Sequence, residues 1–299
     1  MNLVQQKTVY RKFKRFCDEI SVSSEQIQHV RERFDRMLTR LKKDFSTADF
    51  EVKGAFVGSY GRNTAIELSD VDVIVVLPYE VYAQYNAHVN NGQSKLLQSV
   101  RSSLQTTLYR SYIHADGQVV QINFSDGIRF EVVPAFAQRD GSFKTVDTHF
   151  GGSWKLTNPR AEQEAIYAMD RAHNYKCRRL ARMVRVWRDA HHIPMSGWEI
   201  DTLVHRFWSR CKEENLSYEC YGWMVLAFFE FLKDMSDTQS YYIAPGSGQH
   251  VPIKGHFRRQ ANLAYVCAEK ACDYEENGWN RKADSEWRNI FGSRFPSSY

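Results

Sequence analysis

The stretch FVGSYGRNTAIELSDVDVIVVLP, residues 56–78, places two aspartates at the start of an apolar run. Residues two apart on a β-strand point to the same face, so Asp70 and Asp72 project together from the strand predicted over 71–78. Two neighbouring carboxylates repel each other, and the pKa of one should rise. A surface loop could turn both into water, but at the head of a core strand a bound cation is the simpler explanation. Oxygen-rich sites of this kind suit Mg²⁺ or Mn²⁺.

A third carboxylate that could complete a two-metal site is Glu131, in the segment IRFEVVP. It stands between Phe130 and Val132 in a predicted strand, where a carboxylate is costly unless it is paired or binds a metal. Asp116 and Asp126 are alternatives, but both fall in predicted turns, where Asp is common for local hydrogen bonding. We therefore favour Glu131 as the third ligand.

The dipeptide Gly58-Ser59 predicts a strand-to-helix turn ahead of the aspartates. Such a turn exposes backbone N–H groups at a helix N-terminus, and these groups bind phosphate. The Ser59 hydroxyl would add one donor. Most Gly-Ser turns are only turns, but this one precedes Asp70 with Arg62 and Thr64 in between, which strengthens the phosphate-binding interpretation.

The remaining pattern predicts an α/β N-terminal half and a helical C-terminal half, with a boundary near 150–158. Ser23 and Gln26 fit a capping box that opens the first long helix. Strands are expected over 50–57, 71–78, 117–124 and 127–134, and helices over 23–45, 63–68, 93–110, 160–190, 197–214, 220–234 and 257–275. The segment 237–255, with its prolines and glycines, is expected to lack regular structure.

Composition is that of a folded protein: 299 residues, 43% hydrophobic, 25% charged and a formal net charge of +5. The six cysteines form no CxxC pair and are expected to be reduced thiols rather than zinc ligands. The N-terminus lacks the apolar core of a signal peptide, and no apolar run approaches the roughly 20 residues of a membrane span. A cytoplasmic location is the expectation that follows.

The segments GSYGRNTAI, SDVDVIVVL and FEVVPAF together resemble the catalytic core of the nucleotidyltransferase superfamily that includes DNA polymerase beta. More narrowly, the chain resembles bacterial cyclic-oligonucleotide synthases, relatives of cyclic GMP–AMP synthase and oligoadenylate synthase. Three further stretches carry this resemblance: TNP (157–159), the helix with Lys176 followed by VRVWRDAHHIPMSGWEID, and W-x-x-I-F-G-x-x-F-P (287–296). Most relatives carry Asp at the position of Glu131, so metal geometry or preference could differ here.

The resemblance implies an α+β fold: a polymerase beta-like core with a mixed sheet (1–155), a helical nucleotide-binding lobe (156–299), and an active site in the cleft between them. Two Mg²⁺ or Mn²⁺ ions would be held by Asp70, Asp72 and Glu131, the catalytic residues. One ion would hold the donor triphosphate and the other would activate an acceptor hydroxyl, with release of pyrophosphate. The phosphate-binding residues implied are Gly58, Ser59, Arg62, Lys176 and Ser196, and the base would stack on Trp198 or Tyr60.

Ordinary structural roles compete with these assignments. Lys176 could be a solvated lysine of the basic run 176–188, and Ser196 an ordinary turn serine. Most of the seven Trp and 16 Tyr must belong to the core, which weakens any one base-stacking candidate. Arg62 and Arg179 could form surface ion pairs instead of neutralising phosphate.

The leading functional hypothesis is template-independent synthesis of a cyclic di- or trinucleotide second messenger from nucleoside triphosphates, within bacterial anti-phage signalling. One alternative is nucleotide addition to an RNA or protein acceptor; another is a non-catalytic nucleotide sensor on a transferase fold. The intact carboxylate trio argues against the sensor. We expect no membrane partner and, without a zinc-bearing DNA-binding insertion, no direct sensing of double-stranded DNA. A regulatory protein, or an effector that responds to the product, could be a partner.

Overall fold

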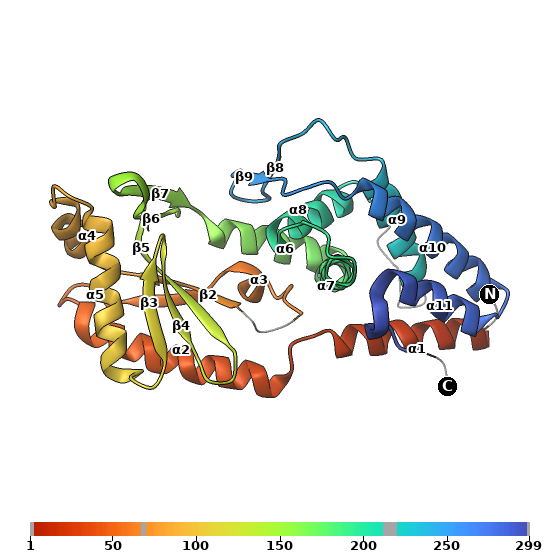
Figure 1. The fold of residues 1–299 in the computed structure, drawn as a ribbon, viewed down its shortest axis with the longest axis horizontal. Coiled ribbons are helices and arrows are strands. Elements are labelled where there is room, and N and C mark those ends of the chain that lie inside the picture. The colour runs from red at the N-terminus through yellow and green to blue at the C-terminus, as the bar shows by residue number, and fades with distance from the viewer. Residues whose placement is uncertain (1–2, 67–69, 212–219, 298–299) are drawn as a thin grey trace. The chain divides into compact units, whose positions relative to one another are not determined.

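The computed structural model describes residues 3–66, 70–211 and 220–297 (Figure 1). The chain forms two compact units, Val22–Gln163 and Met1–Ser21 together with Glu164–Tyr299. We call the first the sheet unit and the second the helical unit. This division differs from the predicted halves, because the first helix of the chain belongs with the C-terminal helices. The prediction that the two halves have separate functions stays a prediction.

The sheet unit is built around one mixed sheet with strand order β1-β2-β5-β4-β3, to which β6 adds beside β5 and β7 beside β6. β2 and β5 run parallel, and the other pairs described are antiparallel. The strands are β1 (Lys53–Phe56), β2 (Asp70–Val76), β3 (Tyr112–Asp116), β4 (Val119–Asn123), β5 (Arg129–Ala137), β6 (Phe143–Asp147) and β7 (Ser153–Thr157). The helical elements are α2 (Ser24–Phe45), α3 (Gly58–Gly61), α4 (Tyr79–Asn86), α5 (Gly92–Thr107) and η1 (His149–Gly151).

One face of this sheet is covered by α2 and α5, which pack against each other (Figure 1). Val71, Val73 and Val75 of β2 belong to the apolar core formed with these two helices. Asp70 and Asp72 are offset from the valines by one residue, so they lie on the opposite face of β2. The alternation that buries the valines therefore also presents the carboxylates away from the helical layer.

The beginning of α2 confirms the predicted capping box. Ser23 Oγ accepts a hydrogen bond from the Gln26 backbone at 3.2 Å, and Gln26 Oε1 accepts one from the Ser23 backbone at 3.1 Å. The helix runs from Ser24 to Phe45, as its three-and-four apolar spacing predicts.

The helical unit is held together by an aromatic core. Phe13 of the first helix packs edge-on against Trp287 and Phe295, at ring-centroid distances of 5.3 and 5.4 Å. Lys12 forms a buried ion pair with Asp284, so the first helix of the chain packs with the C-terminal helices. The helices that lie wholly or mostly in this unit are α1 (Leu3–Glu19), α6 (Pro159–Ala172), α7 (Lys176–Ala190), α8 (Gly197–Trp208), α9 (Tyr221–Lys233), α10 (Arg258–Glu276), α11 (Asn280–Phe291) and η3 (Gly292–Arg294).

The helix predicted over 160–190 is two helices, so the prediction was wrong at residues 173–175. Asn174 and Tyr175 adopt left-handed conformations, with φ of 53° and 61°, which end α6. The Asp170 carboxylate accepts a hydrogen bond from the Arg178 backbone at 3.0 Å and satisfies a donor in the first turn of α7. Periodicity alone does not show this break, because the apolar stripe continues across it.

Two other local predictions were wrong. The segment 237–255 contains a short hairpin, β8 (Tyr241–Ile243) and β9 (His250–Pro252), because its Pro and Gly residues form the turn between two strands. Residues 63–66 form a turn rather than a helix, since the Thr64 N–H donates to the Ser59 carbonyl at 2.9 Å. The described part of the chain leaves out residues 67–68 of that predicted helix. It also leaves out residues 212–214 of the helix predicted over 197–214.

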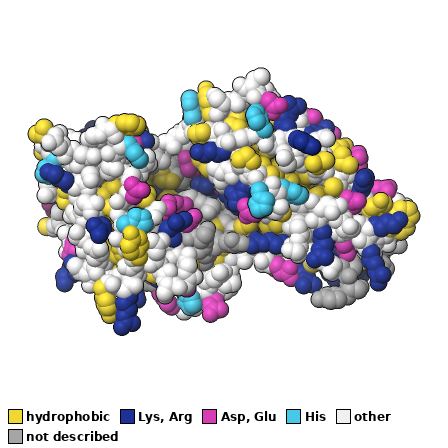
Figure 2. Space-filling model, in the orientation of Figure 1, with side chains coloured by type: hydrophobic (Ala, Val, Ile, Leu, Met, Phe, Trp, Pro, Cys, Tyr) yellow, Lys and Arg dark blue, Asp and Glu magenta, His cyan; other side chains and the backbone are white. Residues whose placement is uncertain are grey.

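Charged side chains are mixed on the surface. Figure 2 shows basic and acidic groups interspersed on the face in view, consistent with the modest formal charge of +5. Among residues 3–66, 70–211 and 220–297, no helix has both the length and the apolar character that crossing a bilayer requires.

Candidate active site

The glycine turn at the end of β1 lies directly against one of the two aspartates. Gly58 begins α3 with φ at +59°, and a Cβ atom there would lie 1.7 Å from Asp72 Oδ2. The Val57 N–H donates to the Asp72 carbonyl at 2.9 Å, which fixes the turn beside the start of β2. Glycine is therefore required at position 58 for two reasons: the backbone there is left-handed, and the Asp72 carboxylate leaves no room for a side chain.

Three carboxylates share one face of two adjacent strands. In the parallel register, Asp72 of β2 stands opposite Glu131 of β5, and Asp70 stands opposite Arg129. All four are half-buried and alternate with fully buried residues. The sequence prediction that Glu131 lies near the aspartate pair agrees with this register.

The surroundings of Asp72 and Glu131 disfavour full ionisation of these two carboxyl groups. Burial is the largest cause that raises the pKa of Asp72; the charge of Asp70 raises it further, while Arg62 opposes the change. Burial likewise raises the pKa of Glu131, with added repulsion from Asp72 and then Asp70. The predicted rise in pKa from neighbouring like charges is therefore present. It shows that the protein groups around this face do not fully neutralise its negative charge.

Arginine and amide groups compensate part of this charge. Arg129 Nε donates to Asp70 Oδ1 at 2.7 Å and lies 3.9 Å from Glu131 Oε1. Gln121, opposite Glu131 on β4, donates from Nε2 to Glu131 Oε1 at 3.0 Å. Within the described residues, no three His, Cys, Asp or Glu side chains are grouped as an assembled metal site. The donor chemistry fits a hard divalent cation, but Asp70 is turned toward an arginine.

Arg62 is a buried residue rather than a surface one. It is 5% exposed, and its guanidinium lies 3.9 Å from Glu162, which is also buried. Its charge opposes the rise in the pKa of Asp72. The alternative of a surface ion pair is therefore wrong for Arg62, which brings a fixed positive charge to the carboxylate face.

Tyr60 is used in packing. Its ring meets Phe56 edge-on at 4.8 Å, and it lies against the apolar core of the sheet unit. Burial raises the pKa of its hydroxyl. Packing in the core therefore explains why an aromatic residue stands at position 60. Base stacking by Tyr60 stays a prediction.

The remaining predicted residues, Lys176, Ser196 and Trp198, lie in the helical unit. Lys176 is the first residue of α7 and is 3% exposed, so it is not a solvated surface lysine. Burial also lowers the pKa of its ammonium group. Ser196 caps α8: its Oγ accepts a hydrogen bond from the Glu199 backbone at 3.1 Å. Trp198 is half-buried on α8.

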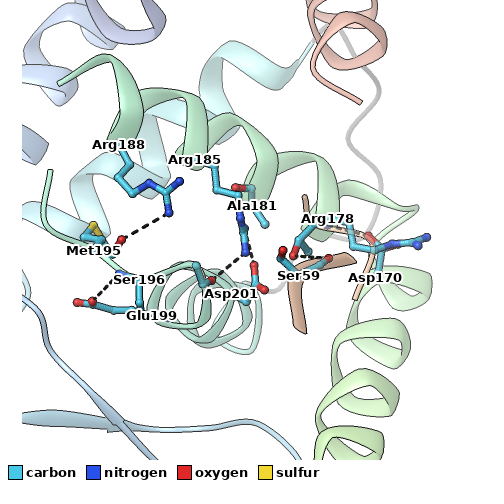
Figure 3. A network of polar contacts seen from close by, with 12 residues as sticks. Ser59, Asp170, Arg178, Ala181, Arg185, Arg188, Met195, Ser196, Glu199 and Asp201 are labelled. Carbon is cyan, nitrogen blue, oxygen red and sulfur yellow. Dashed lines mark hydrogen bonds and ion pairs between the residues drawn. The ribbon is translucent and has the colours of Figure 1, made fainter. Parts of the chain in front are cut away.

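A buried ion pair joins α7 to α8 (Figure 3). Arg185 Nη1 donates to Asp201 Oδ1 at 2.7 Å, and Arg185 Nη2 donates to the Gly197 carbonyl at 2.9 Å. Both side chains are at most 3% exposed. Arg185 therefore holds Gly197, the residue after Ser196, against α7. This contact keeps the N-cap of α8 in place.

Sequence reasoning missed Arg129, Gln121 and the Arg185–Asp201 pair. Alternation could have found Arg129, which lies two residues before Glu131 and so shares its face. Gln121 requires the β4–β5 register, which the sequence does not supply. Arg185 and Asp201 are 16 residues apart and meet only because α7 and α8 pack together.

A mixed sheet that presents carboxylates on adjacent parallel strands, beside a glycine turn, is the core of a nucleotidyltransferase. The chain belongs to the family of Second Messenger Oligonucleotide or Dinucleotide Synthetase domains, whose model matches residues 8–169, more than half of the sequence. The predicted family, α+β fold class and enzyme class are confirmed.

Two curated relatives support the assignment. A probable cyclic nucleotide synthase of Bacillus cereus (strain VD146) is 22% identical over 80% of this chain and 81% of its own length. A cyclic AMP-AMP-AMP synthase of Acinetobacter sp. (strain ATCC 27244 / 9458) is 21% identical over 97% of this chain and 86% of its own.

Solved structures show the same fold. CdnC of E. coli MS115-1, in a complex with HORMA-deltaN, superposes with a TM-score of 0.69 at 17% identity, over 96% of this chain and 98% of CdnC. The Vibrio cholerae di-nucleotide cyclase DncV gives a TM-score of 0.67 at 11% identity, over 98% of this chain and 88% of DncV.

Proposed function

We propose that this chain joins nucleoside triphosphates into a cyclic di- or trinucleotide and releases pyrophosphate. The proposal depends above all on one observation: Asp72 and Glu131 are direct neighbours across two parallel strands, with Asp70 on the same face. Family membership supports it, as do relatives named for cyclic nucleotide synthesis.

Asp70, Asp72 and Glu131 would hold two divalent ions, Mg²⁺ or Mn²⁺. When bound, these ions would supply the positive charge that activates the acceptor hydroxyl and stabilises the departing pyrophosphate. Gly58 and Ser59 would receive the triphosphate through backbone N–H groups and the serine hydroxyl. Arg62 would help to neutralise phosphate charge, and it favours the ionised form of Asp72 against the effect of burial.

The helical unit would supply the remaining contacts to the nucleotide. Lys176 and Ser196 are proposed to contact phosphate, and Trp198 to stack on the donor base. The structure of E. coli MS115-1 CdnC with ATP supports triphosphate as the substrate class. The CdnC complex with HORMA supports a regulatory protein as a class of partner. A role in anti-phage signalling, and a cytoplasmic site of action, are part of the proposal.

Product analysis tests this function. The purified protein is incubated with all four nucleoside triphosphates and Mg²⁺ or Mn²⁺, each triphosphate is omitted in turn, and products are treated with phosphatase and identified by mass spectrometry. We expect a phosphatase-resistant cyclic product. Asp72→Asn, which removes a metal ligand but keeps the shape of the side chain, should lower its yield by about 100- to 1,000-fold.

Other outcomes discriminate between the alternatives. Transfer of label to added RNA or protein, without a cyclic product, would indicate an acceptor-directed transferase. Nucleotide binding without turnover, together with cellular function retained in Asp70→Asn, would indicate a sensor.

A further inference from the structure

One arginine lies between two of the three carboxylates. Arg129 Nε donates to Asp70 Oδ1 at 2.7 Å, and Arg129 Nη2 contacts the same oxygen. Nε also lies 3.9 Å from Glu131 Oε1. Arg129 stands opposite Asp70 in the β2–β5 register, so the backbone itself places these two side chains together.

This pair is accessible, unlike the other arginine beside the site. The side chains of Arg129 and Asp70 are 40% and 44% exposed, whereas Arg62 is buried. An exposed ion pair is weak and exchanges readily with solvent and ions. Arg129 can therefore leave Asp70 without unfolding any part of the sheet.

The pairing also explains how the carboxylates are arranged. Asp70, Asp72 and Glu131 share one face, yet they are not grouped as an assembled metal site in the described residues. A guanidinium bonded to Asp70 Oδ1 takes up one of the two carboxylate oxygens that a divalent ion could use. An arginine guanidinium carries a positive charge, so Arg129 compensates part of the negative charge of the carboxylate face.

We propose that Arg129 is a built-in counter-cation that competes with the divalent metal for Asp70. A metal ion that binds Asp70 must displace or weaken its pair with Arg129, so the pair raises the metal concentration at which the site fills. The inference rests on the proposed function, because it takes Asp70, Asp72 and Glu131 as the metal ligands.

The probe is Mn²⁺ alone, without nucleotide, titrated into the metal-free protein and followed by electron paramagnetic resonance. Arg129→Gln removes the charge and should tighten Mn²⁺ binding about two- to fivefold, the range that exposed ion pairs provide. Arg129→Lys keeps the charge and should stay closer to the parent protein. In an Asp70→Asn background, the same Arg129→Gln change should alter Mn²⁺ affinity less, because only its action on Glu131 is left.

Thermal unfolding gives a second readout. Arg129→Gln should lower the melting temperature in chelator, where the carboxylates lose their counter-cation, and Mn²⁺ should restore it. The matched control is Arg33→Gln, because Arg33 forms a two-bond pair with Asp126 at 3.0 and 2.8 Å elsewhere in the sheet unit. That control should lower stability equally with and without metal and leave Mn²⁺ affinity unchanged.

The two proposals fail in different ways. If the parent protein binds Mn²⁺ but Arg129→Gln binds it no more tightly, Arg129 is a structural partner only and this inference is overturned. If the parent protein binds no Mn²⁺, with or without nucleotide, the metal site itself is disproved and the proposed function falls with it.

Discussion

Asp72 and Glu131 face each other across two parallel strands, and burial raises the pKa of both carboxyl groups. Two acids that are hard to ionise, placed as neighbours, cost the folded protein free energy at neutral pH. A divalent cation bound at the pair would offset this unfavourable free energy, which is consistent with a metal-binding role for the two acids.

The first prediction follows from these raised pKa values. At these two groups the folded state holds protons at a pH at which the unfolded chain has released them, so in the metal-free protein their contribution to the free energy of unfolding should fall as the pH rises above about 4, the pKa of the unfolded groups. Asp72→Asn should reduce this fall, as measured by urea unfolding at several pH values. Asp126→Asn is the control of opposite sign, since Arg33 lowers the pKa of Asp126. An unchanged pH slope in Asp72→Asn would contradict the prediction.

The second prediction concerns the glycine turn. Gly58→Ala should destabilise the protein by more than the roughly 1–2 kcal/mol expected for a left-handed backbone alone, because the new methyl group would overlap the Asp72 carboxylate. Gly141→Ala is the matched control: its φ is +82°, and nothing lies within 4 Å of a Cβ there. Urea unfolding of both variants isolates the contact with Asp72. Equal losses of stability would show that the carboxylate moves aside freely.

The third prediction concerns the buried pair in the helical unit. Arg185→Met leaves the Asp201 charge buried and uncompensated, so it should cost about 3–5 kcal/mol of unfolding free energy. Adding Asp201→Leu should recover much of that loss. Arg188→Met, which breaks the more exposed pair with Asp189, should cost at most about 1 kcal/mol. A double variant no more stable than Arg185→Met would argue against a charge effect.

Local signals in the sequence were sufficient for much of the fold. The alternation in β2 and the capping box of α2 are local patterns, and both appear as expected. The break at Asn174 and Tyr175 was missed because it depends on left-handed backbone and on the Asp170 cap, while the apolar stripe continues. α4, β3, β6, β7 and α11 were not anticipated either, since short or weakly periodic elements depend on their neighbours for stability.

In the candidate site too, the sequence predicted the residues that have a local signal and missed those that depend on tertiary contacts. Asp70 and Asp72 were found because their spacing along one strand fixes their common face, and Gly58 was found because a Gly-Ser dipeptide predicts a turn. Glu131 was found because a carboxylate stands out among apolar residues. Gln121 was missed because its place opposite Glu131 follows only from the β4–β5 register. Partners that meet through tertiary pairing carry no local signal.

The fourth prediction separates two roles of Ser196. As the N-cap of α8 it should lose about 1 kcal/mol of stability when changed to Ala. Ser23→Ala is the matched control, because Ser23 makes the same capping box in α2. If Ser196 also contacts phosphate, Ser196→Ala should raise the KM for the nucleoside triphosphate while Ser23→Ala does not. Ser196→Asp should restore the cap, since Asp is an equally good N-cap residue, and raise KM further through repulsion of phosphate. A KM equal to that of the parent protein in both Ser196 variants would leave the serine as a helix cap only.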